Sequence, residues 1–110
     1  MAQQIYGRET GGKPSKIGKH MTRVDYRPSD KRRFVRYWNT DVVQFDNQWI
    51  TLDNGGFKTA TTKLRMNQTS AEYQLGFSVY QKNFDWFVVT SGGQVIPWGI
   101  GERVSFHRSI

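Results

Sequence analysis

The sequence predicts an α+β domain in which one helix packs against a small, curled antiparallel sheet. Three observations lead to this prediction. Short segments with strand-like patterning are separated by turns rich in Gly, Asn and Asp, one segment alone has helical spacing, and most aromatic residues lie at or after Phe34. The expected order is β-β-α-β-β-β-β, in one domain over residues 34–110. A small half-open barrel is the alternative packing.

The first two strands are expected to form a hairpin. Residues 37–45 have the composition of a strand, and residues 49–52 return as a second strand. The intervening residues 46–48 (Asp-Asn-Gln) suit a turn, because Asp and Asn tolerate left-handed backbone angles.

A helix is predicted from Ala60 to about Gln74. Thr59 or Thr61 can cap its start by accepting a hydrogen bond from a free backbone N–H group, and Gly76 suits its end. Its expected buried face contains the residues at helical spacing, Leu64, Gln68, Ala71 and Leu75.

The rest of the chain is predicted to be β structure. Its strands are expected at residues 77–81, 86–89, 94–96 and 103–107. Pro97 should end the third of these strands or confine it to a sheet edge, because proline has no N–H group to donate.

Residues 1–33 are predicted to form a flexible basic arm. They are poor in large apolar groups, and residues 11–19 read Gly-Gly-Lys-Pro-Ser-Lys-Ile-Gly-Lys, which cannot bury enough surface to offset the entropy of ordering. Residues 1–40 carry ten basic and three acidic side chains, whereas residues 41–110 carry six of each. The whole net charge of +7 therefore belongs to the N-terminal part, which is typical of a polyanion-binding arm.

The composition argues against several classes of site. The chain has no cysteine, which excludes disulfides, thiolate metal sites and cysteine nucleophiles. Its two histidines, His20 and His107, have no partner at metal-ligand or catalytic spacing. We therefore expect no enzyme activity, metal, cofactor or small-molecule substrate. No apolar stretch resembles a signal peptide or membrane span, so an intracellular protein that does not contact membranes is expected.

Two segments could contact phosphates. Residues 31–38 (KRRFVRYW) interleave four cations, which can neutralise phosphates, with three aromatic rings, which can stack on unpaired bases. Their alternative role is a basic linker that enters the first strand, with Phe34 and Trp38 in the core. Residues 55–63 (GGFKTATTK) could hold an anion at a helix N-terminus, although they lack the P-loop spacing. Their alternative role is a capped turn between hairpin and helix.

The segment from Asn39 to Gln68 resembles small bacteriophage proteins of no assigned function. In those proteins a short hairpin leads into Gly-Gly-aromatic-basic-Thr and then Thr-Thr-Lys-x-Arg-Met-Asn-Gln. Here the corresponding residues are 55–59 (GGFKT) and 61–68 (TTKLRMNQ), and the likeness covers residues 38–89. The resemblance implies a phage origin and action in the cytoplasm of an infected bacterium, and it carries over no functional residue.

Together these features predict a non-enzymatic accessory protein that binds DNA or RNA. The alternative is a protein-interaction module, either a modulator of a host enzyme or a virion-assembly component, whose arm docks on an acidic partner. The candidate nucleic-acid contacts are the cations Lys13, Lys16, Lys19, Arg23, Arg27, Lys31, Arg32, Arg33, Arg36, Lys58, Lys63 and Arg65.

Overall fold

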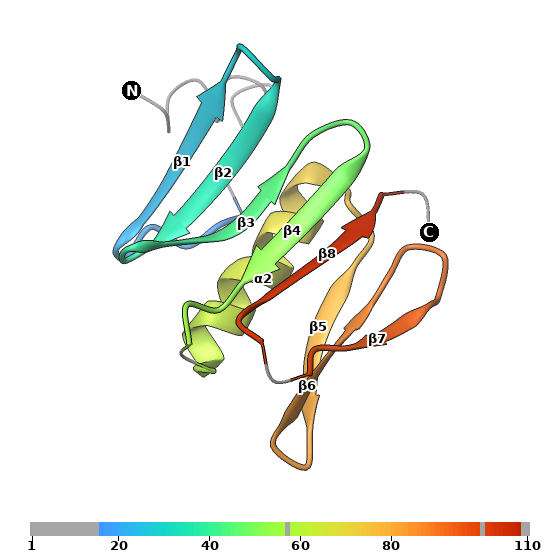
Figure 1. Ribbon diagram of the computed structural model, residues 1–110. Helices are drawn as coiled ribbons and strands as arrows, with labels where there is room; N and C mark the ends of the chain where they lie inside the picture. Colours follow the sequence, from blue (N-terminus) through green and yellow to red (C-terminus); the bar gives the residue numbers. More distant parts are fainter. Residues whose placement is uncertain (1–15, 57, 100, 109–110) are drawn as a thin grey trace.

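The computed structural model describes residues 16–56, 58–99 and 101–108, and it confirms the α+β class (Figure 1). Its elements are β1 (Thr22–Arg27), β2 (Arg32–Tyr37), β3 (Thr40–Phe45), β4 (Trp49–Asp53), α2 (Ala60–Tyr73), β5 (Ser78–Lys82), β6 (Asp85–Val89), β7 (Val95–Pro97) and β8 (Arg103–His107). The strands form two antiparallel sheets rather than one, in the orders β1-β2-β3-β4-β8 and β5-β6-β7. Neither sheet closes into a barrel.

The structure corrects the boundary of the predicted arm. Residues 22–27 and 32–37 form an antiparallel pair in which Val24 lies opposite Val35, and both side chains are buried together with Ile17. This pair is hard to predict from the sequence, because its buried apolar residues occur singly between charged residues that point outward. Backbone hydrogen bonds between the strands supply the remaining stabilisation. Residues 1–15, including the candidate Lys13, lie outside the described residues.

The first predicted strand is in fact two. β2 ends at Tyr37 and β3 begins at Thr40, so Trp38 and Asn39 form a tight turn in which Trp38 has a left-handed backbone (φ 55°). The predicted hairpin between β3 and β4 is confirmed. Its turn is closed by the side chain of Asp46, whose Oδ1 accepts hydrogen bonds from the N–H groups of Gln48 and Trp49, both at 2.8 Å.

Helix α2 has the predicted bounds but a different buried face. Thr59 caps it by accepting from the N–H group of Thr62 (3.2 Å), and Gln74, rather than Gly76, is the left-handed residue at its end. Leu64 is 49% exposed, whereas the buried residues are Thr62, Arg65, Met66, Thr69 and Ser70. Hydrophobic spacing fails here because four of these five side chains are polar, and their hydrogen bonds to neighbouring groups allow burial.

One apolar core joins the helix and both sheets. Helix α2 lies against one face of the five-stranded sheet and also contacts β5. The side chain of Asn67 fixes this second contact, because its amide donates to the carbonyl of Val79 (2.9 Å) and accepts from the N–H group of the same residue (2.7 Å). As predicted, Pro97 ends β7, which is an edge strand.

Candidate functional site

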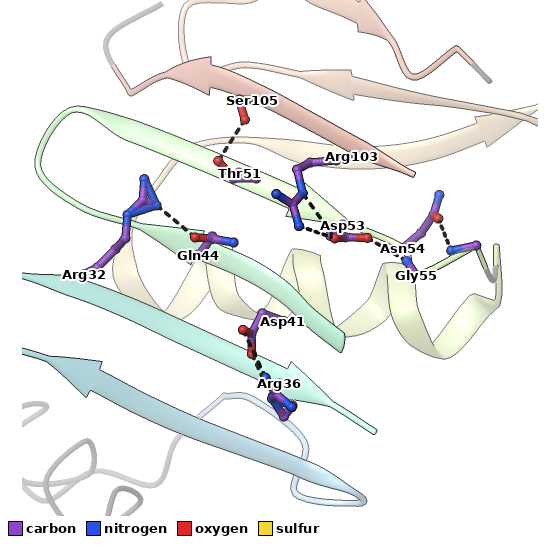
Figure 2. A network of polar contacts seen from close by, with 11 residues as sticks. Arg32, Arg36, Asp41, Gln44, Thr51, Asp53, Asn54, Gly55, Arg103 and Ser105 are labelled. Atoms are coloured by element: carbon purple, nitrogen blue, oxygen red, sulfur yellow. Dashed lines mark hydrogen bonds and ion pairs between the residues drawn. The ribbon is translucent and has the colours of Figure 1, made fainter. Parts of the chain in front are cut away.

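The face of the five-stranded sheet opposite α2 carries many of the predicted cations, and each is matched by a carboxylate. Strand alternation places these arginines on one face, part of which Figure 2 shows around Arg36 and Arg103. The pairs are Arg23 with Asp25 (2.8 Å), Arg27 with Asp30 (2.6 Å), Arg32 with Asp46 (3.5 Å), Arg36 with Asp41 (3.0 Å) and Arg103 with Asp53 (3.1 Å). This open face is therefore close to charge balance.

In two of these pairs the hydrogen bond between the partners favours a charged form. The hydrogen bond to Asp30 raises the pKa of Arg27, and the reciprocal bond lowers the pKa of Asp30. The hydrogen bond to Asp41 raises the pKa of Arg36 in the same way. A phosphate that approached these arginines would have to compete with a carboxylate that is already in place.

Arg65 and Lys63, two other candidates, contact the protein itself. The Arg65 side chain is buried, donates to the Thr22 hydroxyl (2.9 Å) and lies over the Tyr37 ring at 5.6 Å. It thereby ties α2 to β1 and β2. Lys63 donates to the Gln81 side chain (3.3 Å) and connects α2 to the second sheet.

A hollow of about 290 Å³, which we call the cationic hollow, lies at the end of β1 and β2 where the β1–β2 turn joins them. Three cations converge on it. Lys31 lies in the β1–β2 turn, and Arg108 follows β8. Arg33 is the second residue of β2, on the same face as the buried Val35. The full lining consists of Tyr26, Lys31, Arg33, Phe45, Asp46, Asn47, Tyr73 and Arg108.

Aromatic rings hold two of these cations in place. The Arg33 guanidinium lies over the ring of Tyr26 at 4.6 Å and over that of Tyr73 at 5.4 Å. Arg108 lies over Phe45 at 5.7 Å and donates to the main-chain carbonyl of Asp46 at 2.7 Å. Cation–π stacking helps to fix the orientation of both guanidinium groups at the hollow.

Of the carboxylates that the structure describes, Asp46 alone lines the cationic hollow. Burial acts to raise its pKa, but the N–H groups of Trp49 and Gln48 donate to it and Arg32 lies nearby, so the pKa is lowered overall. Its Oδ1 is occupied by those two N–H groups, and its Oδ2 lies 3.5 Å from Arg32. Among the described residues, three cations and one carboxylate thus line the hollow.

A second hollow, of about 440 Å³, lies where the β2–β3 turn meets the start of α2, and we call it the amide hollow. No charged side chain lines it within the part of the chain that the structure describes. Its lining consists of Tyr37, Trp38, Asn39, Thr40, Val42, Asn54, Thr59 and Thr62. Four of these belong to the two segments that the sequence singled out, namely Tyr37, Trp38, Thr59 and Thr62.

Comparison with protein families places the chain in a phage group. The family described as Kyanoviridae Gp96 protein matches residues 7–105. The chain belongs to this family. The resemblance to small phage proteins is thus confirmed, and the family carries no assigned function. No curated protein and no solved structure matches this Gp96 family member.

Two kinds of feature are absent from the described residues, a membrane-spanning helix and a metal-binding cluster. No helix there is long and apolar enough to cross a membrane. No group of three or more His, Asp or Glu side chains in residues 16–56, 58–99 and 101–108 could hold a metal ion.

The structure distributes the cations of the two predicted phosphate-binding segments over different surfaces, although residues of both segments line the amide hollow. Of residues 31–38, Lys31 and Arg33 line the cationic hollow, Arg32 and Arg36 lie on the open face, and Trp38 lines the amide hollow. Lys16, Lys19 and Lys58 are exposed, and none of the three lines either hollow.

Several lining residues of the two hollows were not among the candidates from the sequence. Arg108 and Tyr26 line the cationic hollow, where Tyr26 stacks on Arg33 because the two residues are register partners in the β1–β2 pair. Asn54 lines the amide hollow, where the sequence showed only a turn, and Asn39 does so from the β2–β3 turn. The signal for Tyr26 was the strand alternation of residues 22–27, which the surrounding charges obscured.

Proposed function

We propose that this Gp96-family protein binds nucleic acid, without catalysing a reaction, through the cationic hollow. The observation that supports this most is the convergence of Lys31, Arg33 and Arg108 on one hollow with aromatic walls. Cations that neutralise phosphates release counterions and drive binding. The exposed ring of Tyr26 beside them offers a surface for stacking.

The distribution of charge over the fold supports the same proposal. The described residues carry fourteen basic and eight acidic side chains, so six of the seven net charges belong to them and not to residues 1–15. Five arginines are offset by five aspartates on or beside the open face. The excess therefore comes from the remaining cations, among which Lys31, Arg33 and Arg108 share one hollow. Such a local excess attracts polyanions.

Titration with labelled single- and double-stranded DNA and RNA tests the proposal. Two double variants each remove two positive charges, Arg33→Gln with Arg108→Gln in the cationic hollow and Arg23→Gln with Arg27→Gln on the paired open face. We expect the first to weaken binding at least about tenfold, because hydrogen bonds to charged groups contribute roughly 1.5–3 kcal/mol each. The second should change affinity less than about threefold, because its arginines are already paired.

Thermal unfolding of both double variants controls for a loss of fold. If the intact protein binds none of the four nucleic acids at low salt, the proposal is wrong. It is also wrong if the two double variants weaken binding equally, because the charge of the hollow would then have no special part.

A second candidate function, contact with an acidic protein, is favoured by Phe84. This side chain is 86% exposed at the tip of the β5–β6 hairpin, and its backbone is left-handed (φ 70°). Aromatic residues are common among the side chains that anchor protein interfaces. If the protein captures a partner from nuclease-treated host lysate, Phe84→Ala should release it, whereas the same substitution should leave nucleic-acid binding unchanged.

A further inference from the structure

We infer that the amide hollow binds one planar, nucleobase-like heterocycle that presents a hydrogen-bond acceptor. The ring can come from a nucleic-acid strand or from a free nucleoside. The chemistry of the hollow is the same for both sources. Binding of a ring from a strand rests on the proposed function, whereas binding of a free nucleoside does not.

Asn54 supplies an unused donor. Its side chain is only 3% exposed, and its Oδ1 accepts from the N–H group of Gly56 at 2.8 Å. This bond fixes the orientation of the amide, because a backbone N–H group requires an acceptor. The Nδ2 group, on the other side of the amide, is buried with no hydrogen-bond partner. A buried unpaired donor is costly, and an acceptor on a bound ring would remove that cost.

The start of α2 also lines the hollow, through Thr59 and Thr62. Thr59 satisfies the N–H group of Thr62, but the first N–H groups of a helix have no partner within the helix itself. The first turn contains no acidic side chain that would offset the positive end of the helix dipole. The hollow therefore favours an electron-rich atom, such as a carbonyl oxygen or a ring nitrogen.

Trp38 supplies the stacking surface. Its side chain is 56% exposed, and its left-handed backbone (φ 55°) is costly for a residue other than glycine. Its ring meets that of Tyr37 edge to face, with centroids 6.5 Å apart, and Tyr37 is held from another side by Arg65. A strained, exposed indole on a fixed support contributes little to folding, and it suits stacking against a planar ring.

The lining favours a ring over a phosphate. No charged side chain lines the hollow within the described residues, and its walls combine the rings of Tyr37 and Trp38 with Val42. A volume of about 440 Å³ lies within the range of small-ligand sites. Arg33 lines the cationic hollow and Tyr37 lines the amide hollow, so about 13 Å of extended chain separates the two hollows along β2. A single nucleoside cannot reach both hollows, which allows each to be tested alone.

The test titrates the full chain with each of the four free ribonucleosides and follows the Asn54 amide and Trp38 indole signals by NMR. Asn54→Asp keeps the acceptor for Gly56 but replaces the free donor with an oxygen, and Trp38→Ala removes an exposed ring without opening the core. We expect a nucleoside to shift both signals in the unaltered protein. Each substitution should weaken that binding at least about fivefold, which matches a loss of about 1 kcal/mol. Trp49→Ala is the matched control, because Trp49 is a similarly exposed tryptophan outside the hollow.

The same variants, titrated with single-stranded oligonucleotides, separate the two sources. If free nucleosides do not bind but Trp38→Ala and Asn54→Asp both weaken oligonucleotide binding at least fivefold, the ring comes from a strand and the inference holds. If nucleosides bind equally well to both variants, or if neither nucleoside nor oligonucleotide binding depends on them, the inference is wrong. The double variant Arg33→Gln with Arg108→Gln tests the proposed function separately. Its affinity for nucleosides should stay within about twofold of that of the unaltered protein.

Discussion

Arg33 and Tyr26 face each other across the β1–β2 pair, and the Arg33 guanidinium lies 4.6 Å from the centroid of the Tyr26 ring. This contact exists only because residues 22–27 form a strand. The cationic hollow therefore depends on the folding of a segment whose composition suggests a flexible arm. In our account the positive charge is presented on a fixed surface, which reduces the entropy lost when a polyanion binds.

We predict that a chain limited to residues 34–110 is much less stable than the full chain. It would lack β1 and the start of β2, and the core would lose the buried side chains of Ile17 and Val24. Full burial of each such side chain contributes roughly 1.5–3 kcal/mol, so the free energy of unfolding should fall by at least about 3 kcal/mol. Urea unfolding of both chains measures this difference, and equal midpoints with equal slopes would show that the N-terminal hairpin is dispensable.

The sequence supports the fold best where its segments follow simple patterns. The β3–β4 hairpin and the start of α2 were predictable, because Asp46 and Thr59 are residue types that close turns and cap helices through local hydrogen bonds. The β1–β2 hairpin was not, because Val24 and Val35 bury one side chain each among charged neighbours. Its stability depends on strand pairing, which local composition does not report.

The buried face of α2 can be tested with two substitutions of similar size. Met66 is fully buried, whereas Leu64 is 49% exposed. Met66→Ala should lower the free energy of unfolding by about 2–5 kcal/mol, because it leaves a cavity in the core. Leu64→Ala should change it by no more than about 0.5 kcal/mol. Chemical denaturation measures both, and a larger cost for Leu64→Ala would restore the face expected from hydrophobic spacing.

Replacement of Gly55 should lower the free energy of unfolding, because Gly55 lies against Thr40, which lines the amide hollow. A Cβ atom at Gly55 would meet the Thr40 Oγ1 atom at 2.4 Å, whereas a Cβ atom at Gly93 would meet nothing within 4 Å. Both glycines have a left-handed backbone, so Gly93→Ala is a control for that cost alone. We expect Gly55→Ala to destabilise the protein by about 1 kcal/mol more than the control.

The double variant Gly55→Ala with Thr40→Ala should recover most of the difference, because it removes the hydroxyl that the new Cβ atom would meet. Thermal unfolding of the four proteins completes the comparison. Equal losses for Gly55→Ala and Gly93→Ala would mean that the contact with Thr40 imposes no constraint.

Asp46 should make the stability of the protein depend on pH in the acidic range. Its pKa is lowered in the folded state from an ordinary value of 3.8, despite partial burial, by the N–H groups of Trp49 and Gln48 and by Arg32. A lowered carboxyl pKa stabilises the fold above the unfolded pKa, and this stabilisation is lost as the pH falls through the folded value. Asp46→Asn should therefore flatten the decline in stability between about pH 5 and pH 2.

Urea unfolding at a series of pH values measures this effect. Asp85→Asn is the control, since Asp85 is an exposed carboxylate on β6. Parallel pH curves for Asp46→Asn and the unaltered protein would contradict the assignment.

The two hollows could be only partly predicted from the sequence. The basic segment 31–38 does contribute Lys31 and Arg33, but strand alternation sends Arg32 and Arg36 to the open face, where carboxylates offset them. Arg108 comes from the far end of the chain, and no local pattern connects it with Arg33. The unpaired donor of Asn54 depends on which groups surround a buried amide, and this is a property of the packed structure.

The salt dependence of binding shows whether the cationic hollow provides the phosphate contacts. Lys31→Ala and Lys82→Ala each remove one exposed lysine beside a hairpin turn, but only Lys31 lines the hollow. Each neutralised phosphate contributes about 0.7–0.9 to the magnitude of the slope of log K against log salt concentration. We predict that Lys31→Ala lowers the magnitude of the slope by about that amount and that Lys82→Ala leaves it unchanged. An unchanged slope for Lys31→Ala, or an equal change for both variants, would contradict the account.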